Sequence, residues 1–214
     1  RFDHLDGRLK DGLDTFGWEL SHFFQLLKKN NTGVLEMLYN KTWIHLDERF
    51  AEIIKYRDQF LDLNRLYKCL KGYIQHERHL TMGNKRGQIG GKRFEQVEKF
   101  EYSPKNAVQG LRLMWSGTYV MNTLEFPVCV KNYDINVHNM LLNIKIHPEE
   151  YTKEHIVNLL DVYEKSLDMT FELEKEKVNK TKFNENLANE LILKNYLPIL
   201  EKNHNQNQRN RFRV

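Results

Sequence analysis

Three polar residues are spaced to share one face of a predicted helix near the middle of the chain. Ser103-Pro104 is a good helix start, because Ser is a favoured N-cap and Pro fits the first helical position. Lys105, Gln109 and Arg112 follow at positions i, i+4 and i+7, on one side of such a helix. Two cations and an amide suit an anionic ligand, since arginine can grip phosphate oxygens in bidentate fashion. On spacing alone, an ordinary solvated face is the simpler interpretation.

A basic, glycine-rich segment over residues 82–93 invites a phosphate-binding interpretation. Its four cations are Lys85, Arg86, Lys92 and Arg93. A P-loop requires Gly five positions before its Gly-Lys pair and Ser or Thr after it, but Arg86 and Arg93 occupy those positions. The P-loop interpretation therefore fails. We expect either a cationic loop that contacts a nucleic-acid phosphate backbone or, more simply, a solvated linker.

Two carboxylates near the N-terminus, Asp11 and Asp14, flank Gly12 just before the first predicted helix. Carboxylates at the end of a strand can bind Mg²⁺, which prefers oxygen ligands, and acidic residues in an ordinary turn are the alternative. The chain contains no His-Glu-x-x-His and no Cys-x-x-Cys motif. The closest histidine pair, His76 and His79, is more simply explained by surface or core histidines than by a zinc site.

Long helices are expected to position these residues, because the chain has only 4 Pro and 11 Gly. A strand and turn are predicted over residues 1–13, from two Asp-Gly turn signals. Helices are predicted over residues 17–29, 34–39, 46–81, 103–121, 136–144, 152–175 and 184–200. The third can break near Asp62, and the last should kink or end near Pro198. The tail from residue 203 is predicted to be disordered.

Composition narrows the class of protein. Lys and Arg number 33 against 29 Asp and Glu, so the net charge of +4 neither requires nor excludes a polyanionic partner. With 40% hydrophobic residues the chain can bury a core, and no apolar run is long enough to cross a membrane. Two cysteines rule out a disulfide framework and fit a reducing cytoplasm. The Glu, Lys and Asn content is typical of a bacterial or phage protein.

Two ordered blocks of sequence resemble the predicted nucleotidyltransferases of the DNA polymerase β superfamily, including RNA-ligase-associated RNA-repair members. Residues 13–38, which include LDTFGWEL and VLEML, are similar to the family's strand ending in Asp, its Trp-Glu-Leu helix and its Asn-Pro-x-x-Leu-Glu-x-Leu turn. Residues 91–113 resemble the family's Tyr-x-x-Lys-x-Ala-x-His-x-x-Arg-Leu helix. The resemblance extends over roughly residues 13–174.

The chain departs from the family pattern at several positions. Thr32 replaces a Pro, Gln109 replaces a His, and Leu124 replaces a Gly. The family's Gly-Ser…Ser-Asp-x-Asp segment, which carries the first two catalytic carboxylates, is not found among these residues. Because residue 1 is Arg and not Met, we expect that the chain was cut downstream of this segment, or that the protein has lost it.

The resemblance implies an α+β fold, with a small mixed β-sheet of nucleotidyltransferase type, largely upstream or incomplete here, and a mainly helical C-terminal region. Residues 1–45 would end the catalytic domain, 46–202 would form the helical region, and 203–214 the disordered tail. Glu19 and Glu36 are expected to be structural, tying helices together or capping them.

The implied activity is transfer of a nucleoside monophosphate from an NTP to a hydroxyl acceptor, such as an RNA or DNA 3′ end, with two Mg²⁺ ions. Asp14 would be the third carboxylate and a metal ligand. Lys105 and Arg112 would balance phosphate charge, with Gln109 beside them in the substrate site. The four cations of segment 82–93 would contact the acceptor. The competing interpretation is a catalytically degenerate helical module that binds nucleic acid or a protein partner.

Overall fold

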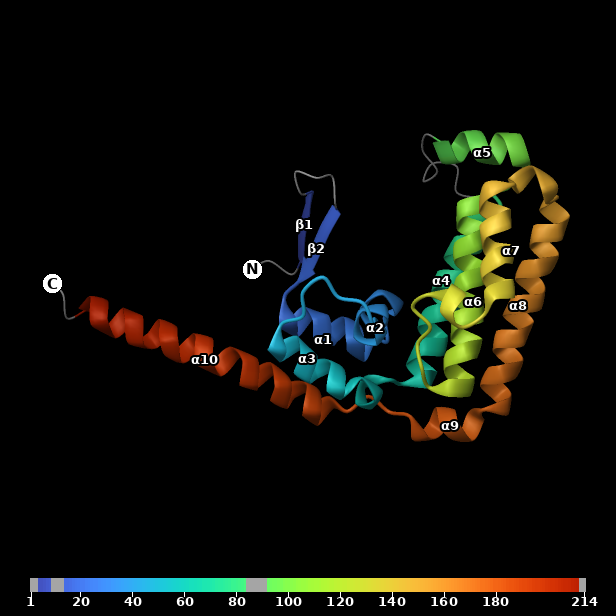
Figure 1. Cartoon of the computed structure of the whole chain (residues 1–214). Helices are drawn as coiled ribbons and strands as arrows, with labels where there is room; N and C mark the ends of the chain where they lie inside the picture. The colour runs from blue at the N-terminus through green and yellow to red at the C-terminus, as the bar shows by residue number, and fades with distance from the viewer. Residues whose placement is uncertain (1–3, 9–13, 84–91, 212–214) are drawn as a thin grey trace.

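The computed structural model describes residues 4–8, 14–83 and 92–211, and the side chains of residues 17–83 and 94–198. These residues form a mainly helical molecule with one β-hairpin (Figure 1). In chain order the elements are β1 (His4–Arg8), β2 (Asp14–Trp18), α1 (Leu20–Lys28), α2 (Thr32–Tyr39), α3 (Glu48–Lys55), η1 (Arg57–Phe60), α4 (Leu63–Thr81), α5 (Lys92–Phe100), α6 (Pro104–Thr123), η3 (Val130–Asn132), α7 (Ile135–Ile146), η4 (Pro148–Glu150), α8 (Lys153–Leu173), α9 (Lys175–Lys180) and α10 (Glu185–Arg211).

Helices α4, α6, α7 and α8 run side by side as a bundle, and α6 packs against each of the other three (Figure 1). Helices α4 and α8 both approach α6 closely at Gly117. A Cβ atom there would lie 2.5 Å from Cδ1 of Leu70 on α4 and 2.9 Å from Cδ1 of Leu167 on α8. Real Cβ atoms do not approach other atoms so closely, so a side chain at this position would require these two buried leucines to move.

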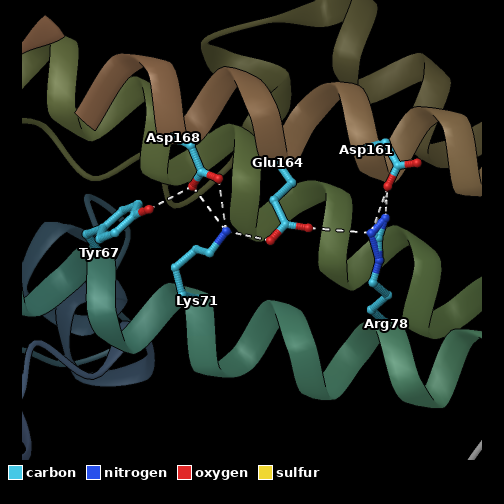
Figure 2. A network of polar contacts seen from close by, with 6 residues as sticks. All are labelled: Tyr67, Lys71, Arg78, Asp161, Glu164 and Asp168. Carbon is cyan, nitrogen blue, oxygen red and sulfur yellow. Dashed lines mark hydrogen bonds and ion pairs between the residues drawn. The ribbon is translucent and has the colours of Figure 1, made fainter. Parts of the chain in front are cut away.

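A network of polar side chains joins α4 to α8 on one side of this bundle. Figure 2 shows its members, which are Tyr67, Lys71 and Arg78 from α4 and Asp161, Glu164 and Asp168 from α8. The ammonium of Lys71 contacts both Glu164 and Asp168, and the hydroxyl of Tyr67 donates to Asp168 at 2.8 Å. Arg78 pairs with Asp161. The cations on this face of α4 are therefore neutralised within the protein.

The two strands pair as an antiparallel hairpin, with His4 opposite Trp18 and Arg8 opposite Asp14. Residues 5–8, which carry an Asp-Gly signal, lie inside β1 and do not form the turn predicted for them, because cross-strand pairing with residues 14–17 holds them extended. Within the described ranges this hairpin is the whole of the sheet. The mainly helical prediction is confirmed, but a nucleotidyltransferase-type sheet is not shown.

Local capping signals begin the long helices where the sequence predicts. The carboxylate of Asp62 accepts a hydrogen bond from the Arg65 N–H at 3.1 Å, and so separates α4 from the preceding α3. Thr152 caps α8 in the same way, through the N–H of His155. α6 begins at Pro104 as predicted, but the Ser103 hydroxyl does not cap it. That hydroxyl donates instead to a side chain within the first turn.

Asn30 joins the N-terminal helices to the bundle. This buried residue has a left-handed backbone, with φ of 53°, a conformation that asparagine tolerates better than most residues. Its amide donates to the carbonyls of Leu27 and Phe60, while its side-chain oxygen accepts from the N–H of Asp62 at 2.8 Å. The end of α1 is therefore held against the start of α4.

The C-terminal helix is longer than the sequence predicts. α10 continues through Pro198 to Arg211, whereas the sequence predicts a kink or an end near Pro198 and disorder from residue 203. Residues 199–211 contain no further Pro and no Gly, the two residue types that most disfavour the interior of a helix. In the described part of the chain, no helix is both long and apolar enough to span a membrane.

Candidate functional site

A polar cavity of about 850 Å³ opens between α4, α5, α6 and α7. Its walls carry three basic side chains, one carboxylate and several amides. The lining residues are His76, Glu77, Leu80, Gln96, Pro104, Lys105, Asn106, Val108, Gln109 and Lys145. The cavity therefore lies over the face of α6 that the sequence analysis singled out. It is wide enough for a ligand of nucleotide size.

Two of the three predicted substrate-binding residues, Lys105 and Gln109, line this cavity one helical turn apart. Lys105 is exposed in the first turn of α6 and forms no ion pair with any described residue. Lys145, in the last turn of α7, is also exposed and also unpaired among the described side chains. The cavity thus has two available ammonium groups on different helices, with the amide of Gln109 in the same wall.

A chain of buried hydrogen bonds anchors the wall of the cavity. The Ser103 hydroxyl donates to Oδ1 of Asn106 at 2.7 Å, and Nδ2 of Asn106 donates to Oε2 of Glu77 at 2.7 Å. The backbone N–H of Ser103 also donates to the carbonyl of Thr81 at 2.9 Å. These bonds fasten the start of α6 to the end of α4. Glu77 is the one carboxylate among the residues that line the cavity, and it already accepts a hydrogen bond from Asn106.

Arg112 has a partner of its own outside the cavity wall. Its Nη1 donates to Oε1 of Glu36 at 2.7 Å, and its Nε donates to Gln109 at 3.3 Å. The contact with Gln109 shows that these two residues lie on the same side of α6. The ion pair connects α6 to α2, so Glu36 ties helices together as predicted. Glu19 is structural too, because its carboxylate caps α1 through the N–H groups of Ser21 and His22.

The remaining predicted site residues cannot be placed around this cavity. Asp14 is the first residue of β2, opposite Arg8, and so begins a strand where the sequence predicted the end of one. Its side chain lies outside the described part of the structure. The same holds for the side chains of the cations at the start of α5. Those two residues are Lys92 and Arg93, while Lys85 and Arg86 lie wholly outside the described residues.

The described side chains include no set of ligands for a metal ion. No group of three or more His, Cys, Asp and Glu residues is clustered there. A two-metal site needs several carboxylates converging on the same ions, and the described residues do not fit that requirement. The expectation of Mg²⁺ therefore rests on the resemblance alone.

Sequence reasoning missed several polar residues of the cavity, among them Lys145, Asn106 and His76. Lys145 comes from a different helix and no local pattern connects it to Lys105. Asn106 is adjacent to Lys105 in sequence, but its burial against Glu77 depends on the packing of α6 on α4. His76 was considered only as a possible metal ligand with His79. Its position on the cavity-facing side of α4 was available from helical periodicity.

Comparison with known protein families matches most of the chain. A family model described as the RNA repair pathway DNA polymerase beta family matches residues 2–194. The matched range contains the hairpin, the four-helix bundle and every residue that lines the cavity. No curated protein and no solved structure matches the chain.

Proposed function

The chain belongs to the RNA repair pathway DNA polymerase beta family, and we propose on this ground that it transfers a nucleoside monophosphate from an NTP to a hydroxyl acceptor at a nucleic-acid 3′ end. In this reaction the acceptor oxygen attacks the α-phosphorus and loses its proton. The bond between the α-phosphorus and the bridging oxygen breaks, and pyrophosphate leaves. The protein must therefore hold a highly charged triphosphate in place.

The proposal rests on two lysines that line the cavity described above, which we call the α6 cavity, and that form no ion pair with any described residue. Lys105 and Lys145 supply positive charge from two helices, and Gln109 supplies an amide between them and Arg112. Lysine binds phosphate as a point charge, and preorganised positive charge is the main contribution a protein makes to phosphoryl transfer. In this proposal Lys105 and Lys145 hold phosphate groups, and Arg112 supports the wall through its bond to Gln109.

Asp14 keeps the role of metal-binding carboxylate within this proposal, because the resemblance assigns it to that position. The first two catalytic carboxylates of the family pattern are not found in these 214 residues. The roles that rest on this chain's own side chains are the binding and orientation of phosphate groups.

The second candidate function is a helical module that binds nucleic acid or a protein partner without catalysis. The absence of a carboxylate cluster among the described residues favours it. Transfer of label from an NTP separates the two candidates. Such a module would bind RNA or a partner, but would incorporate no nucleotide.

The test uses α-labelled NTPs, Mg²⁺ and an RNA with a free 3′-hydroxyl, together with calorimetric titration of NTP. Lys105→Ala and Lys145→Ala should each weaken NTP binding by about 10- to 150-fold, the range for a lost charge-assisted contact of about 1.5–3 kcal/mol. Lys165→Ala, which removes an exposed charge from α8, is the matched control and should bind NTP normally. Unchanged NTP affinity in both cavity variants would refute this assignment of the site.

A further inference from the structure

A second, more basic groove lies on the other side of α4's N-terminal half. It has a volume of about 650 Å³ and is lined by the end of α1 and the first two turns of α4. Four of its six lining residues are cations. The lining residues are Gln25, Lys28, Lys29, Arg65, Lys68 and Cys69. Burial raises the pKa of the Cys69 thiol, so the groove offers positive charge and no thiolate at neutral pH.

Only part of this charge is balanced inside the protein. Lys28 pairs with Glu185, and Arg65 pairs with Asp62 while also donating to the carbonyl of Lys28 at 2.9 Å. These contacts hold α1 and α4 together at the base of the groove. The other two cations, Lys29 and Lys68, also line the groove. Both are exposed and form no ion pair with any described residue.

One face of α4 connects this groove to the α6 cavity. The face consists of Arg65, Lys68, Gly72, Tyr73 and His76, which recur at helical spacing, and we refer to it as the α4 track. It begins in the groove and ends at His76 in the cavity wall. At a rise of 1.5 Å per residue the track is about 16 Å long, which suits a few nucleotides of an extended strand.

The middle of the α4 track combines an aromatic ring with open space. Tyr73 is 37% exposed, and its hydroxyl accepts a hydrogen bond from Nδ2 of Asn31 at 2.8 Å, which fixes the ring's orientation. A Cβ built on the neighbouring Gly72 would meet no atom within 4 Å. A base can therefore approach the ring without obstruction from the helix.

The opposite face of α4 has a different electrostatic character. There, Lys71 and Arg78 are neutralised by the carboxylates of α8 (Figure 2). In Figure 1, α1 and α2 lie beside α4 on the side away from α8, where the groove is found. Lys68 is thus the one Lys or Arg of α4 that has no ion pair among the described residues, and it lies on the α4 track. Two carboxylates beside the track are already engaged, because Asp62 pairs with Arg65 and Glu77 accepts a hydrogen bond from Asn106.

We propose that the α4 track binds the single-stranded nucleic-acid acceptor, with Lys29 and Lys68 on its phosphates and Tyr73 stacked on a base. This inference rests on the proposed function, because such a strand would direct its end toward the cavity that holds the NTP. A basic groove combined with an exposed aromatic ring is the arrangement that recognises single strands without reading their sequence. An acidic peptide would use the lysines but would gain nothing from stacking on Tyr73.

The test measures binding of a labelled single-stranded RNA of about 12 nucleotides by fluorescence anisotropy over a range of salt concentrations. Each phosphate contact contributes about 0.7 to the slope of log K against log salt for a single strand. The double variant Lys29→Ala/Lys68→Ala should therefore lower the slope by about 1.4. Lys153→Ala/Lys165→Ala removes two exposed charges from α8 and should leave the slope unchanged.

Substitutions of Tyr73 separate stacking from simple charge attraction. Tyr73→Leu should weaken RNA binding by about 5- to 150-fold, the range for loss of one stacked base. Tyr73→Phe keeps the ring and loses only the bond to Asn31, so it should bind RNA nearly as well as the wild type. Equal affinity of the Leu and Phe variants would overturn the stacking contact, and a glutamate-rich peptide binding as tightly as the RNA would assign the track to a protein partner.

The same samples distinguish failure of this inference from failure of the proposed function. NTP affinity, measured by calorimetry, should be unchanged in Lys29→Ala/Lys68→Ala, because neither residue lines the α6 cavity. A wild-type salt slope in that variant would refute the α4 track, whether or not nucleotide is transferred. RNA binding with the expected slope, but with no nucleotide transfer by the wild type, would refute the proposed function and leave the α4 track standing.

Discussion

Arg112→Ala is expected to reduce the stability of the protein much more than its affinity for NTP. The guanidinium of Arg112 is paired with Glu36 at 2.7 Å, and the pair connects α6 to α2. The side chains are 24% and 29% exposed, so removing one leaves the other partly desolvated without its partner. The resemblance alone predicts a different outcome, in which Arg112 holds phosphate and its loss weakens NTP binding.

The magnitude follows from the burial of this ion pair. Exposed pairs contribute about 0–1 kcal/mol, whereas breaking a fully buried pair costs about 3–5 kcal/mol. The intermediate exposure of Arg112 and Glu36, discounted for screening by the water they still contact, places the loss at about 1–2 kcal/mol. For a chain of this length the melting temperature falls by about 2–4 °C per kcal/mol, so we expect a decrease of about 2–8 °C.

The assay is a double-mutant cycle that combines Arg112→Ala with Glu36→Gln, followed by thermal and urea unfolding. If the two residues act through their mutual contact, the double variant should be about as stable as either single variant, because the pair is already broken in each. Calorimetric titration of NTP should give nearly wild-type affinity for Arg112→Ala. A wild-type melting temperature together with NTP binding weakened tenfold or more would refute this reasoning and return Arg112 to the phosphate site.

Three further predictions address other parts of the molecule. Asp14→Asn should abolish nucleotide transfer with an unchanged melting temperature, and near-normal incorporation of labelled NTP would show that another carboxylate acts there. Gly117→Ala should cost about 1–3 kcal/mol through overpacking against Leu70 and Leu167, while the matched Gly72→Ala, which meets open space, should leave urea stability unchanged or slightly raise it. Burial, aided by the hydrogen bond to Asp168, raises the pKa of Tyr67 to about 12. The pKa of tyrosine in an unfolded chain is about 10. The contribution of Tyr67 to the free energy of unfolding is therefore present below pH 10 and is lost between about pH 10 and 12. Urea unfolding of Tyr67→Phe should therefore show a smaller loss of stability over that range, and an identical loss would contradict this.

Much of the helical organisation was predictable, because it depends on interactions between residues close together in sequence. Asp62 and Thr152 cap helices through N–H groups three residues away, and Pro104 marks the start of α6 for a similarly local reason. The shared face of Lys105, Gln109 and Arg112 follows from helical periodicity alone. The length of α10 was not predictable, because an interior proline such as Pro198 favours a kink or an end of the helix.

The partners of these side chains were decided by tertiary packing. Arg112 meets Glu36 from a helix 76 residues away, and Lys105 shares its cavity with Lys145 of α7. These juxtapositions depend on how the neighbouring helices pack against α6, as α4 and α8 do at Gly117, where a Cβ atom would meet Leu70 and Leu167. The sequence by itself therefore determined which residues could bind phosphate. Only the packing of the helices decided which of those cations remain free, because a charge that finds a carboxylate on a neighbouring helix is no longer available to a ligand.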